Sequence, residues 1–273
     1  MADGNQNIVE IPGKGFSESL IDADGFSIRY REAGQGTPAV WLHGGGGLRI
    51  SPVYDMLAES RRVIAFEIPG FGNSAANERS QNMQELADTV LAAVTALGID
   101  KFDLVGSSFG GKLAAWMAVR APERVTTLVL CSPAAIRLEK VEGAGDRGLG
   151  PNFLYAHPER QPPMEPSSEE IVTKERALIS RVRGPARDAE LEAALAALEV
   201  QTLVLLGTED RISRSELADI YRGMMPACQV VMIYDAAHAI DADRPDAVAS
   251  VMQDFLTRQE RFLVKEQSGL LYP

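Results

Sequence analysis

The chain of 273 residues is 45% hydrophobic, which is enough apolar material for one large core, so we expect a single domain over residues 1–273. Its formal net charge of −11 at pH 7 opposes binding to nucleic acid and to anionic membrane surfaces. The first seven residues lack the basic and apolar segments of a signal peptide, and no apolar run reaches ~18 residues, so a soluble cytoplasmic protein is expected. Cys131 and Cys228 stand beside apolar runs, which favours buried thiols over a disulfide framework or a metal site.

The first elements predict a strand hairpin followed by a glycine-rich loop. Two strand-like runs between residues 17 and 31 flank Asp24-Gly25, a dipeptide typical of tight turns. The apolar run 39–42 predicts a buried strand, and it ends in His43 and four glycines at 44–47. Loops of this type supply a backbone N–H to an oxyanion hole, where side chains would block the approach of substrate. We expect the His43 side chain to anchor this loop by hydrogen bonding.

Strands and helices then alternate along the chain. A short helix near 52–58 precedes a strand at 62–66, and apolar residues recur at helical spacing from Met83 to Leu97. Further strands are predicted at 102–105 and 125–130, with a helical segment between them. This alternation is typical of right-handed βαβ units in a parallel sheet, so the apolar helix faces are expected to pack on the sheet.

The stretch from Gly106 to Gly111 has the pattern G-x-S-x-G between a predicted strand and a predicted helix. This is the context of a nucleophile elbow with Ser108 at its tip. A sharp strand-to-helix turn strains the serine backbone and needs small neighbours, which Gly106 and Gly110 provide. The following helix would direct its free N–H groups and its positive dipole end at an oxyanion beside Ser108. The pattern alone recurs by chance, so its weight depends on the residues that accompany it.

The stretch 134–197, between the sixth and seventh predicted strands, interrupts the alternation and is expected to form a short cap or lid. Its first half is rich in glycine and proline and should form no long helix; a movable lid and a plain linker are weighed equally. In the second half, Ser167 and Glu170 form a capping box that would begin a helix running to about Val182. A second helix is expected over 186–198.

Two further predicted strands end near candidate partners for Ser108. The apolar run 201–206 is followed by Asp210, and the run 229–234 is followed by His238. A serine nucleophile needs a base and an acid that orients the base, so we assign His238 as base and Asp210 as acid. The chain contains three histidines in all, which argues against a chance arrangement. The neighbouring Glu209 is a rival acid.

Together these motifs resemble those of the α/β-hydrolase family over about residues 26–259, with Ser, Asp and His in the family's chain order. The stretch Glu67 to Ser74 resembles the family's D-x-P-G-x-G-x-S turn, with Glu where Asp is usual. His238 to Pro245 resembles its H-x-x-x-x-E-R-P segment, with Asp243 where Glu is usual. The resemblance implies an α/β-hydrolase fold, in which a mostly parallel twisted sheet is flanked by helices and carries a short cap insertion.

The resemblance also implies a role for each matching residue. Ser108 would be the nucleophile, His238 the general base and then acid, and Asp210 its orienter. The amides of Phe109 and Gly45 would be the oxyanion donors, with Gly46 a close second to Gly45. This machinery needs no metal and no organic cofactor. The expected partner is a small-molecule substrate, and the oligomeric state is left open.

The first functional hypothesis is hydrolysis of a carboxylic ester through an acyl-enzyme on Ser108. The alternative is hydrolysis of a carbon–carbon bond in a ring-cleavage product, because the glycines at 44–47 resemble the oxyanion loop of those hydrolases. Against it stand Ser107, where those enzymes often carry Asn, and Ala239, where they often carry Trp. Haloalkane dehalogenation would need Asp at position 108, whereas perhydrolase or haloperoxidase activity could accompany an esterase. A receptor that keeps the hydrolase fold is a hypothesis of a different class, which the intact set of three residues disfavours.

Several other residues have ordinary interpretations. His157 has no partner at metal-ligand spacing and is expected to be an exposed lid residue. Lys112 is expected to be a charge on a helix face rather than a catalytic amine. Trp41 and Trp116 are expected in the core.

Overall fold

The computed structural model describes residues 11–138, 150–161, 167–259, 264–265 and 270–271. Within this part of the chain the main sheet has eight strands: β1 (Ser17–Ala23), β2 (Phe26–Ala33), β3 (Pro38–Leu42), β4 (Arg62–Phe66), β5 (Phe102–Ser107), β6 (Val125–Cys131), β7 (Gln201–Gly207) and β8 (Cys228–Ile233). The helices are α1 (Pro52–Ala58), α2 (Met83–Ala96), α3 (Phe109–Arg120), α4 (Pro151–Leu154), α5 (Glu169–Val182), α6 (Ala189–Ala196), α7 (Glu216–Met224), α8 (Ile240–Asp243) and α9 (Pro245–Arg258). A 3-10 turn, η1, covers Pro158–Arg160.

The strands follow the order β1-β2-β4-β3-β5-β6-β7-β8 across the sheet. β1 and β2 pair antiparallel, as do β2 and β4, and every pair from β4 through β8 is parallel. Central strands such as β3 and β7 are almost continuously apolar because helices cover both of their faces. This arrangement confirms the mostly parallel α/β fold that the sequence predicts.

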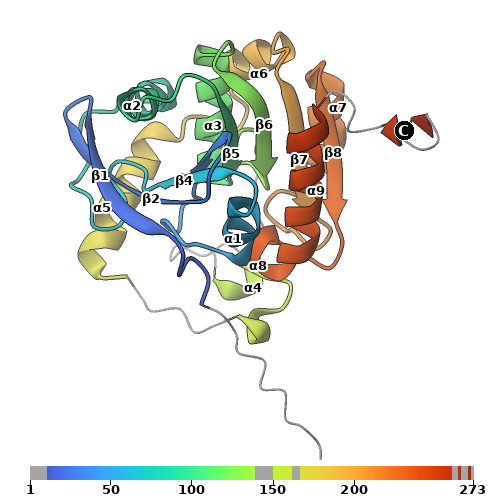
Figure 1. Ribbon diagram of the computed structural model, residues 1–273, viewed down its shortest axis with the longest axis horizontal. Coiled ribbons are helices and arrows are strands. Elements are labelled where there is room, and N and C mark those ends of the chain that lie inside the picture. The colour runs from blue at the N-terminus through green and yellow to red at the C-terminus, as the bar shows by residue number, and fades with distance from the viewer. Residues whose placement is uncertain (1–10, 139–149, 162–166, 260–263, 266–269, 272–273) are drawn as a thin grey trace, which may run out of the picture.

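Two layers of helices enclose the sheet (Figure 1). On one face, residues of α2, α3, α6 and α7 pack against the strands in one core, which includes Trp116. On the other face, α1, α8 and α9 form a second core, which includes Trp41. Both tryptophans are therefore buried as expected. We therefore look for functional residues in the loops rather than in either core.

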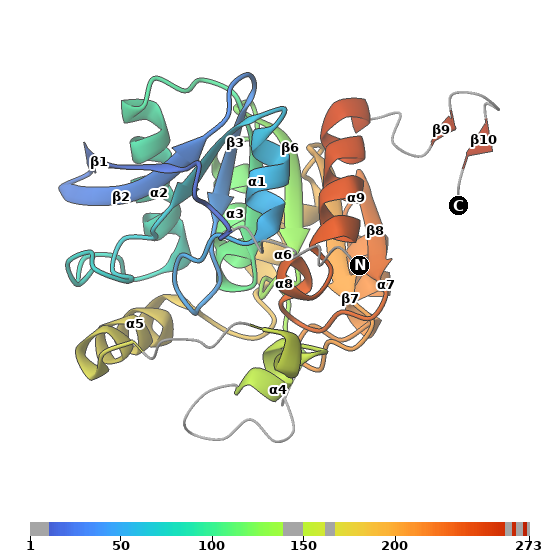
Figure 2. The same cartoon turned by 60° about the horizontal axis from the view of Figure 1, so that its bottom comes forward.

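The parallel strands point their carboxyl ends toward one edge of the molecule, and α4 and α5 lie beyond that edge (Figure 2). Both helices belong to the segment between β6 and β7. The loops that leave β3, β5, β7 and β8 at this edge carry His43, Ser108, Asp210 and His238. These four residues are far apart in the sequence but lie at the carboxyl ends of the strands, where parallel α/β sheets bind their ligands.

The segment between β6 and β7 differs from the sequence expectation in two details. α5 begins at Glu169, and its N-cap is Ser168, whose side chain accepts a hydrogen bond from the Ile171 amide. The expected cap at Ser167 is wrong by one residue, because two adjacent serines offer the same chemistry. α6 is shorter than the expected 186–198 and begins at Ala189, because the Asp188 side chain caps it by accepting from the Leu191 amide.

In the glycine- and proline-rich half of this segment, the described residues 150–161 contain the single-turn helix α4 and the turn η1. Short turns of this kind agree with the expectation of no long helix. Residues 139–149 and 162–166, on which the choice between lid and linker depends, lie outside the described residues.

Beyond α9, the strands β9 (Val264–Lys265) and β10 (Leu270–Leu271) pair with each other antiparallel. Figure 2 places this pair to the side of the main body. Across the described ranges, no helix combines the length and the apolar composition that crossing a membrane would require.

Candidate active site

Ser108 occupies a strained turn between β5 and α3. Its backbone has φ 49° and ψ −110°, and a positive φ is uncommon for a residue with a side chain. Neighbouring strands and loops hold the turn: the Ser108 amide donates to the Cys131 carbonyl at 2.9 Å, and the Ala134 amide donates to the Ser108 carbonyl at 2.9 Å. The structure therefore has the elbow geometry that the sequence predicts.

The two glycines beside Ser108 are required by close backbone contacts. A Cβ atom on Gly106 would stand 2.3 Å from the Gly110 carbonyl oxygen, and one on Gly110 would stand 2.4 Å from the His43 carbonyl oxygen. Real Cβ atoms do not approach backbone so closely, so larger residues would push α3 away from β3 and β5. The need for small neighbours is thus a matter of packing as well as of backbone angles.

A continuous line of hydrogen bonds joins Ser108, His238 and Asp210. The distance from Ser108 Oγ to His238 Nε2 is 2.9 Å, and that from His238 Nδ1 to Asp210 Oδ2 is also 2.9 Å. Because a carboxylate accepts, His238 donates from Nδ1, and its Nε2 is left to accept the Ser108 proton. The structure brings together all three residues that sequence reasoning selected.

The second oxygen of Asp210 fixes the orientation of the carboxylate. Oδ1 accepts hydrogen bonds from the amides of Ile212 at 2.7 Å and Ser213 at 2.9 Å. Burial alone would raise the pKa of Asp210, but the hydrogen bond from His238 and these two amides outweigh it, and the pKa is lowered. Asp210 is therefore ionised and held in place, whereas the rival Glu209 is exposed and hydrogen-bonded to Thr208.

His43 anchors the glycine loop, as expected. Its Nε2 accepts from the Ile68 amide at 3.0 Å, so Nδ1 carries the proton and donates to the Gly44 carbonyl at 2.7 Å. The residue is 3% exposed, and this burial lowers the pKa of His43 to about 4. His43 is thus neutral and has both nitrogens engaged, so His238 remains the candidate base.

The burial of His43 predicts a loss of stability in mild acid. An unfolded chain takes up a proton on histidine below about pH 6.5, whereas the folded protein does so below about pH 4. The contribution of neutral His43 to the free energy of unfolding is fully present above pH 6.5 and is lost as the pH drops toward 4. The loss amounts to about 2–3 kcal/mol at pH 4.5. Urea unfolding at pH 7 and pH 4.5 measures it, and the His43→Gln variant should lack most of this decrease. An equal decrease in both proteins would contradict the assignment.

A cavity of about 390 Å³ opens beside Ser108 and His238. It is lined by the loop 44–47 and by several side chains that sequence reasoning did not select: Arg49, Tyr54, Cys131, Leu154, Ile240 and Asp241. Gly45 and Gly46, the two candidate oxyanion donors of the loop, both line it. Burial raises the pKa of Asp241. Ile240 and Asp241 lie within three residues of His238 in the sequence, and this proximity is the signal that could have found them.

Phe109, the other expected oxyanion donor, is the first residue of α3, so its amide has no acceptor within the helix. The residue is 5% exposed, and its ring packs against that of Phe71 at 5.5 Å between centroids. The ring therefore belongs to the core, and the amide is the part of Phe109 that is available at the elbow.

Two sequence interpretations need correction. Lys112 is not a charge on an exposed helix face: it is 1% exposed, pairs with Asp188 at 3.1 Å and donates to the Arg183 carbonyl at 2.9 Å. His157 is not simply exposed, because its ring is half-buried against Asp235 at 2.8 Å. Asp188 and Asp235 lie far from Lys112 and His157 in the sequence, so local patterns do not predict these contacts.

The expectation of buried thiols is confirmed. Both cysteines are free and buried, and burial raises the pKa of the Cys228 thiol to about 12. Glu67, which replaces the usual Asp, is buried and accepts from Arg29 at 3.1 Å and from Ser74 at 2.7 Å. No group of three or more potential metal ligands occurs within the described ranges.

The sheet order and the serine on a strained strand-to-helix turn define a class of proteins, the α/β hydrolases. A family model described as the alpha/beta hydrolase family matches residues 39–251. The chain belongs to this family and is a hydrolase.

The chain is similar to several known proteins. It is 30% identical over 268 residues to a 2-hydroxymuconate semialdehyde hydrolase of Pseudomonas sp. (strain CF600), covering 88% of this chain and 94% of that protein. It is 26% identical to a 2-hydroxy-6-oxo-6-phenylhexa-2,4-dienoate hydrolase of Burkholderia cepacia, covering 85% of this chain and 91% of that protein. Among solved structures, a bacterial membrane phospholipase A superposes with a TM-score of 0.75 at 26% identity, over 89% of this chain and 86% of that one.

Proposed function

We propose that this protein is a serine hydrolase in which Ser108 attacks a carbonyl carbon of a small molecule. The observation that carries the proposal is the line of hydrogen bonds from the Asp210 carboxylate through the His238 ring to the Ser108 hydroxyl, two members of which line the cavity. A serine, a base and an orienting acid in this geometry suit covalent catalysis of acyl transfer.

The reaction proceeds in two halves. His238 Nε2 takes the Ser108 proton as Oγ bonds to the carbonyl carbon, and the resulting oxyanion accepts from the amides of Phe109 and Gly45. The protonated His238 then gives its proton to the leaving atom, and an acyl group stays on Ser108. Water, activated by the same base, releases the acid and restores the serine. Asp210 holds the ring in the required tautomer and stabilises its charged form throughout.

We infer further that the leaving atom is carbon and that the substrate is a ring-cleavage product, a 2-hydroxy-6-oxohexa-2,4-dienoate or the related semialdehyde. Water is added across the bond: hydroxyl goes to the acyl carbon, which becomes a carboxylic acid, and hydrogen goes to the carbon that leaves with the dienoate. Two similar proteins bear the names of such hydrolases. Arg49 adds a positive charge to the cavity lining, which suits an anionic substrate, and about 390 Å³ accommodates a molecule of this size.

Ester hydrolysis is the second candidate, because two residues beside the site depart from the pattern of ring-cleavage hydrolases. Ser107 stands where those enzymes often carry Asn, and its hydroxyl lies 3.4 Å from Trp41 Nε1. Ala239 stands where they often carry Trp. The similarity to a phospholipase A, whose name denotes ester cleavage, points the same way.

A substrate panel separates the two candidates. We expect 2-hydroxymuconate semialdehyde, or its methyl- or phenyl-ketone analogue, to be hydrolysed with kcat/KM of about 10⁴ M⁻¹ s⁻¹ or more, within the usual range of enzymes. The loss of dienol absorbance gives the rate, and mass spectrometry identifies the acid and the dienoate. A p-nitrophenyl ester series from acetate to long acyl chains is run beside it.

Turnover of the ring-cleavage products well above that of every ester would support the carbon–carbon assignment. Fast ester hydrolysis with no cleavage of the dienoates would replace it with the ester hydrolase. Tight binding of one ligand without turnover of any compound would contradict the hydrolase proposal and favour the receptor.

A further inference from the structure

The segment 150–161 touches both sides of the candidate active site. Leu154, at the end of α4, lines the cavity, and its carbonyl accepts a hydrogen bond from the Ala239 amide at 2.8 Å. The next residue, Tyr155, interacts with Arg49, which follows the glycine loop. The segment 150–161 therefore connects the region of the glycine loop 44–47 to the loop that carries His238.

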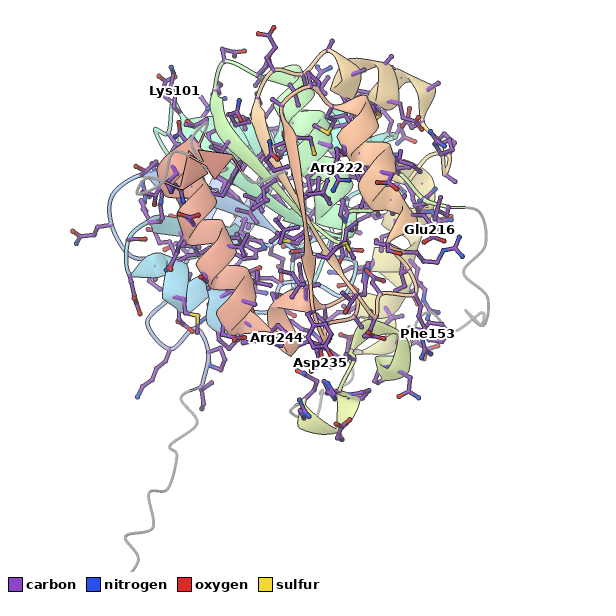
Figure 3. All side chains as sticks on the ribbon, turned by 90° about the vertical axis from the view of Figure 1, so that its right-hand side faces the viewer. Lys101, Phe153, Glu216, Arg222, Asp235 and Arg244 are labelled. Atoms are coloured by element: carbon purple, nitrogen blue, oxygen red, sulfur yellow. The ribbon has the colours of Figure 1, made fainter. Side chains whose placement is uncertain are left out.

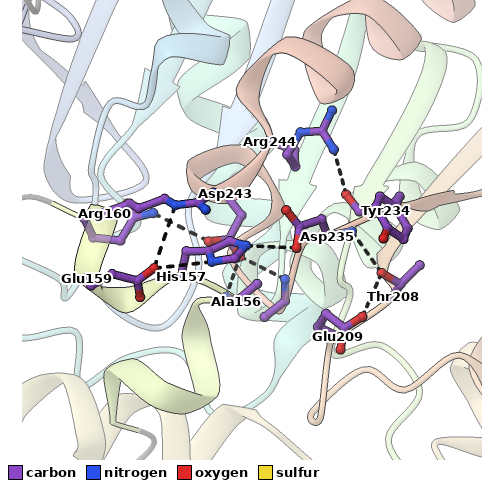
Figure 4. A network of polar contacts seen from close by, with 12 residues as sticks. Ala156, His157, Glu159, Arg160, Thr208, Glu209, Tyr234, Asp235, Asp243 and Arg244 are labelled. Atoms are coloured by element: carbon purple, nitrogen blue, oxygen red, sulfur yellow. Dashed lines mark hydrogen bonds and ion pairs between the residues drawn. The ribbon is translucent and has the colours of Figure 1, made fainter.

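Asp243, the last residue of α8, connects this segment to the loop before His238 (Figure 4). One of its carboxylate oxygens, Oδ2, accepts from the Ala156 amide at 2.9 Å and from the Ala237 amide at 2.9 Å. The other oxygen lies 3.5 Å from the Gln161 side-chain nitrogen. Ala237 immediately precedes His238, so one carboxylate fixes the backbone beside the base and the segment that carries Leu154.

Neighbouring contacts show how that loop is held elsewhere. The Asp235 amide donates to the Thr208 hydroxyl at 3.1 Å, and the Ala236 carbonyl accepts from the Glu209 amide at 2.9 Å. These bonds tie the loop to the residues just before Asp210. The Ala237 amide donates to Asp243, and within the described ranges no other side chain accepts from it.

A second contact between the same two segments is the pair of His157 and Asp235, at 2.8 Å. Figure 4 shows it beside the Asp243 contacts, with Glu159 on the other ring nitrogen of His157. Figure 3 places Asp235 and Phe153 at the end of the molecule opposite Lys101, which precedes β5. The connection thus lies at the carboxyl ends of the strands, where the candidate site is.

We propose that Asp243 is a positioning residue for the hydrolytic reaction: its carboxylate couples the placement of His238 to the placement of the 150–161 segment over the cavity. The inference rests on the proposed role of His238 as the base for Ser108. It assigns to Asp243 a task that a shorter or apolar residue could not perform, because one oxygen must reach two amides from different parts of the chain.

Three variants test the proposal. Asp243→Ala removes both acceptors, whereas Asp243→Asn keeps one oxygen that can accept from both amides. Asp246→Asn is the matched control, because Asp246 lies three residues further on, is exposed and pairs with Arg244. Each protein is treated with a fluorophosphonate, which reacts with a base-activated serine whatever the natural substrate is, and the rate of Ser108 labelling is measured by mass spectrometry.

Displacement of a catalytic group by about 1 Å costs on the order of 100-fold in rate, so we expect Asp243→Ala to label about 10- to 100-fold more slowly than the wild type. Asp243→Asn should restore the rate to within about threefold, and Asp246→Asn should match the wild type. Hydrogen exchange at the Ala156 and Ala237 amides should accelerate together in Asp243→Ala. Normal labelling by a folded Asp243→Ala protein would overturn the proposal, as would slow labelling that Asn does not relieve.

The same experiment separates this inference from the proposed function. A wild-type protein that labels rapidly but cleaves no ring-cleavage product contradicts the substrate assignment, while the comparison of the three variants still decides the role of Asp243. A wild-type protein that does not label contradicts Ser108 as the nucleophile, and the inference about Asp243 falls with it. If Asp243 is structural alone, Asp243→Ala will lower the melting temperature and leave the labelling rate of the folded protein unchanged.

Discussion

Ser108→Ala is expected to lower kcat on any substrate that the protein turns over by at least about 10⁴-fold, because the variant has no nucleophile for the acyl intermediate. The change removes one hydroxyl and leaves the strained turn, since alanine can be held at the same φ of 49° by the same backbone contacts. Substrate binding should be retained. Steady-state assays on the best substrate of the panel give the ratio, and isothermal titration gives the affinity of the inactive protein.

Ser107→Ala serves as the matched comparison. Ser107 also lines the cavity, but its hydroxyl lies near Trp41 rather than His238. We expect its removal to change kcat by less than about tenfold. Comparable losses in both variants, or more than about 1% of wild-type activity in Ser108→Ala, would count against Ser108 as the nucleophile.

Asp210→Asn is expected to lower kcat by about 10³- to 10⁴-fold through the tautomer of His238. The amides of Ile212 and Ser213 both point at Oδ1, so they will fix the single amide oxygen of asparagine at that position. The asparagine NH₂ group then faces His238 Nδ1, which must accept. The proton moves to Nε2, and Nε2 can no longer take the proton of Ser108. A measurement of kcat in the folded variant, with the tautomer read from imidazole ¹⁵N shifts, tests both halves of the argument.

Glu209→Gln is the control for this effect and also tests the rival acid. Glu209 is adjacent in sequence, carries the same charge and is exposed, with Thr208 as its hydrogen-bond partner. Its replacement should leave kcat within about threefold of the wild type. A large loss in Glu209→Gln together with a small one in Asp210→Asn would reverse the assignment.

The sheet and the hydrogen-bonded residues Ser108, His238 and Asp210 could be predicted from the sequence, because local residue patterns encode both. Strands buried on two faces appear as apolar runs, and the turns that end them need glycine or carry the reacting side chains. The run 201–206 and Asp210 are one example. The elbow is another, since the contacts of Gly106 and Gly110 leave room for no side chain.

The sequence could not predict contacts between residues that only tertiary packing brings together. Lys112 has the charge of a surface residue and is buried because Asp188, 76 positions away, neutralises it. Arg49 and Tyr54 line the cavity because of the path of the loop after β3, which no periodicity describes. The cap of α5 differed by one residue, since Ser167 and Ser168 are chemically equivalent and packing selects the register.

The buried pair of Lys112 and Asp188 limits how this protein can be re-engineered. Lys112 lies on α3, whose N-cap is Ser108, whereas both of its partners, Asp188 and the Arg183 carbonyl, belong to the stretch that leads from α5 to α6. A stretch grafted from another hydrolase that covers Lys112 without these acceptors would leave a buried ammonium group without a partner, at a cost of about 3–5 kcal/mol. The insertion is therefore not an exchangeable module, and a chimera will need Lys112 replaced by an apolar residue in the same step.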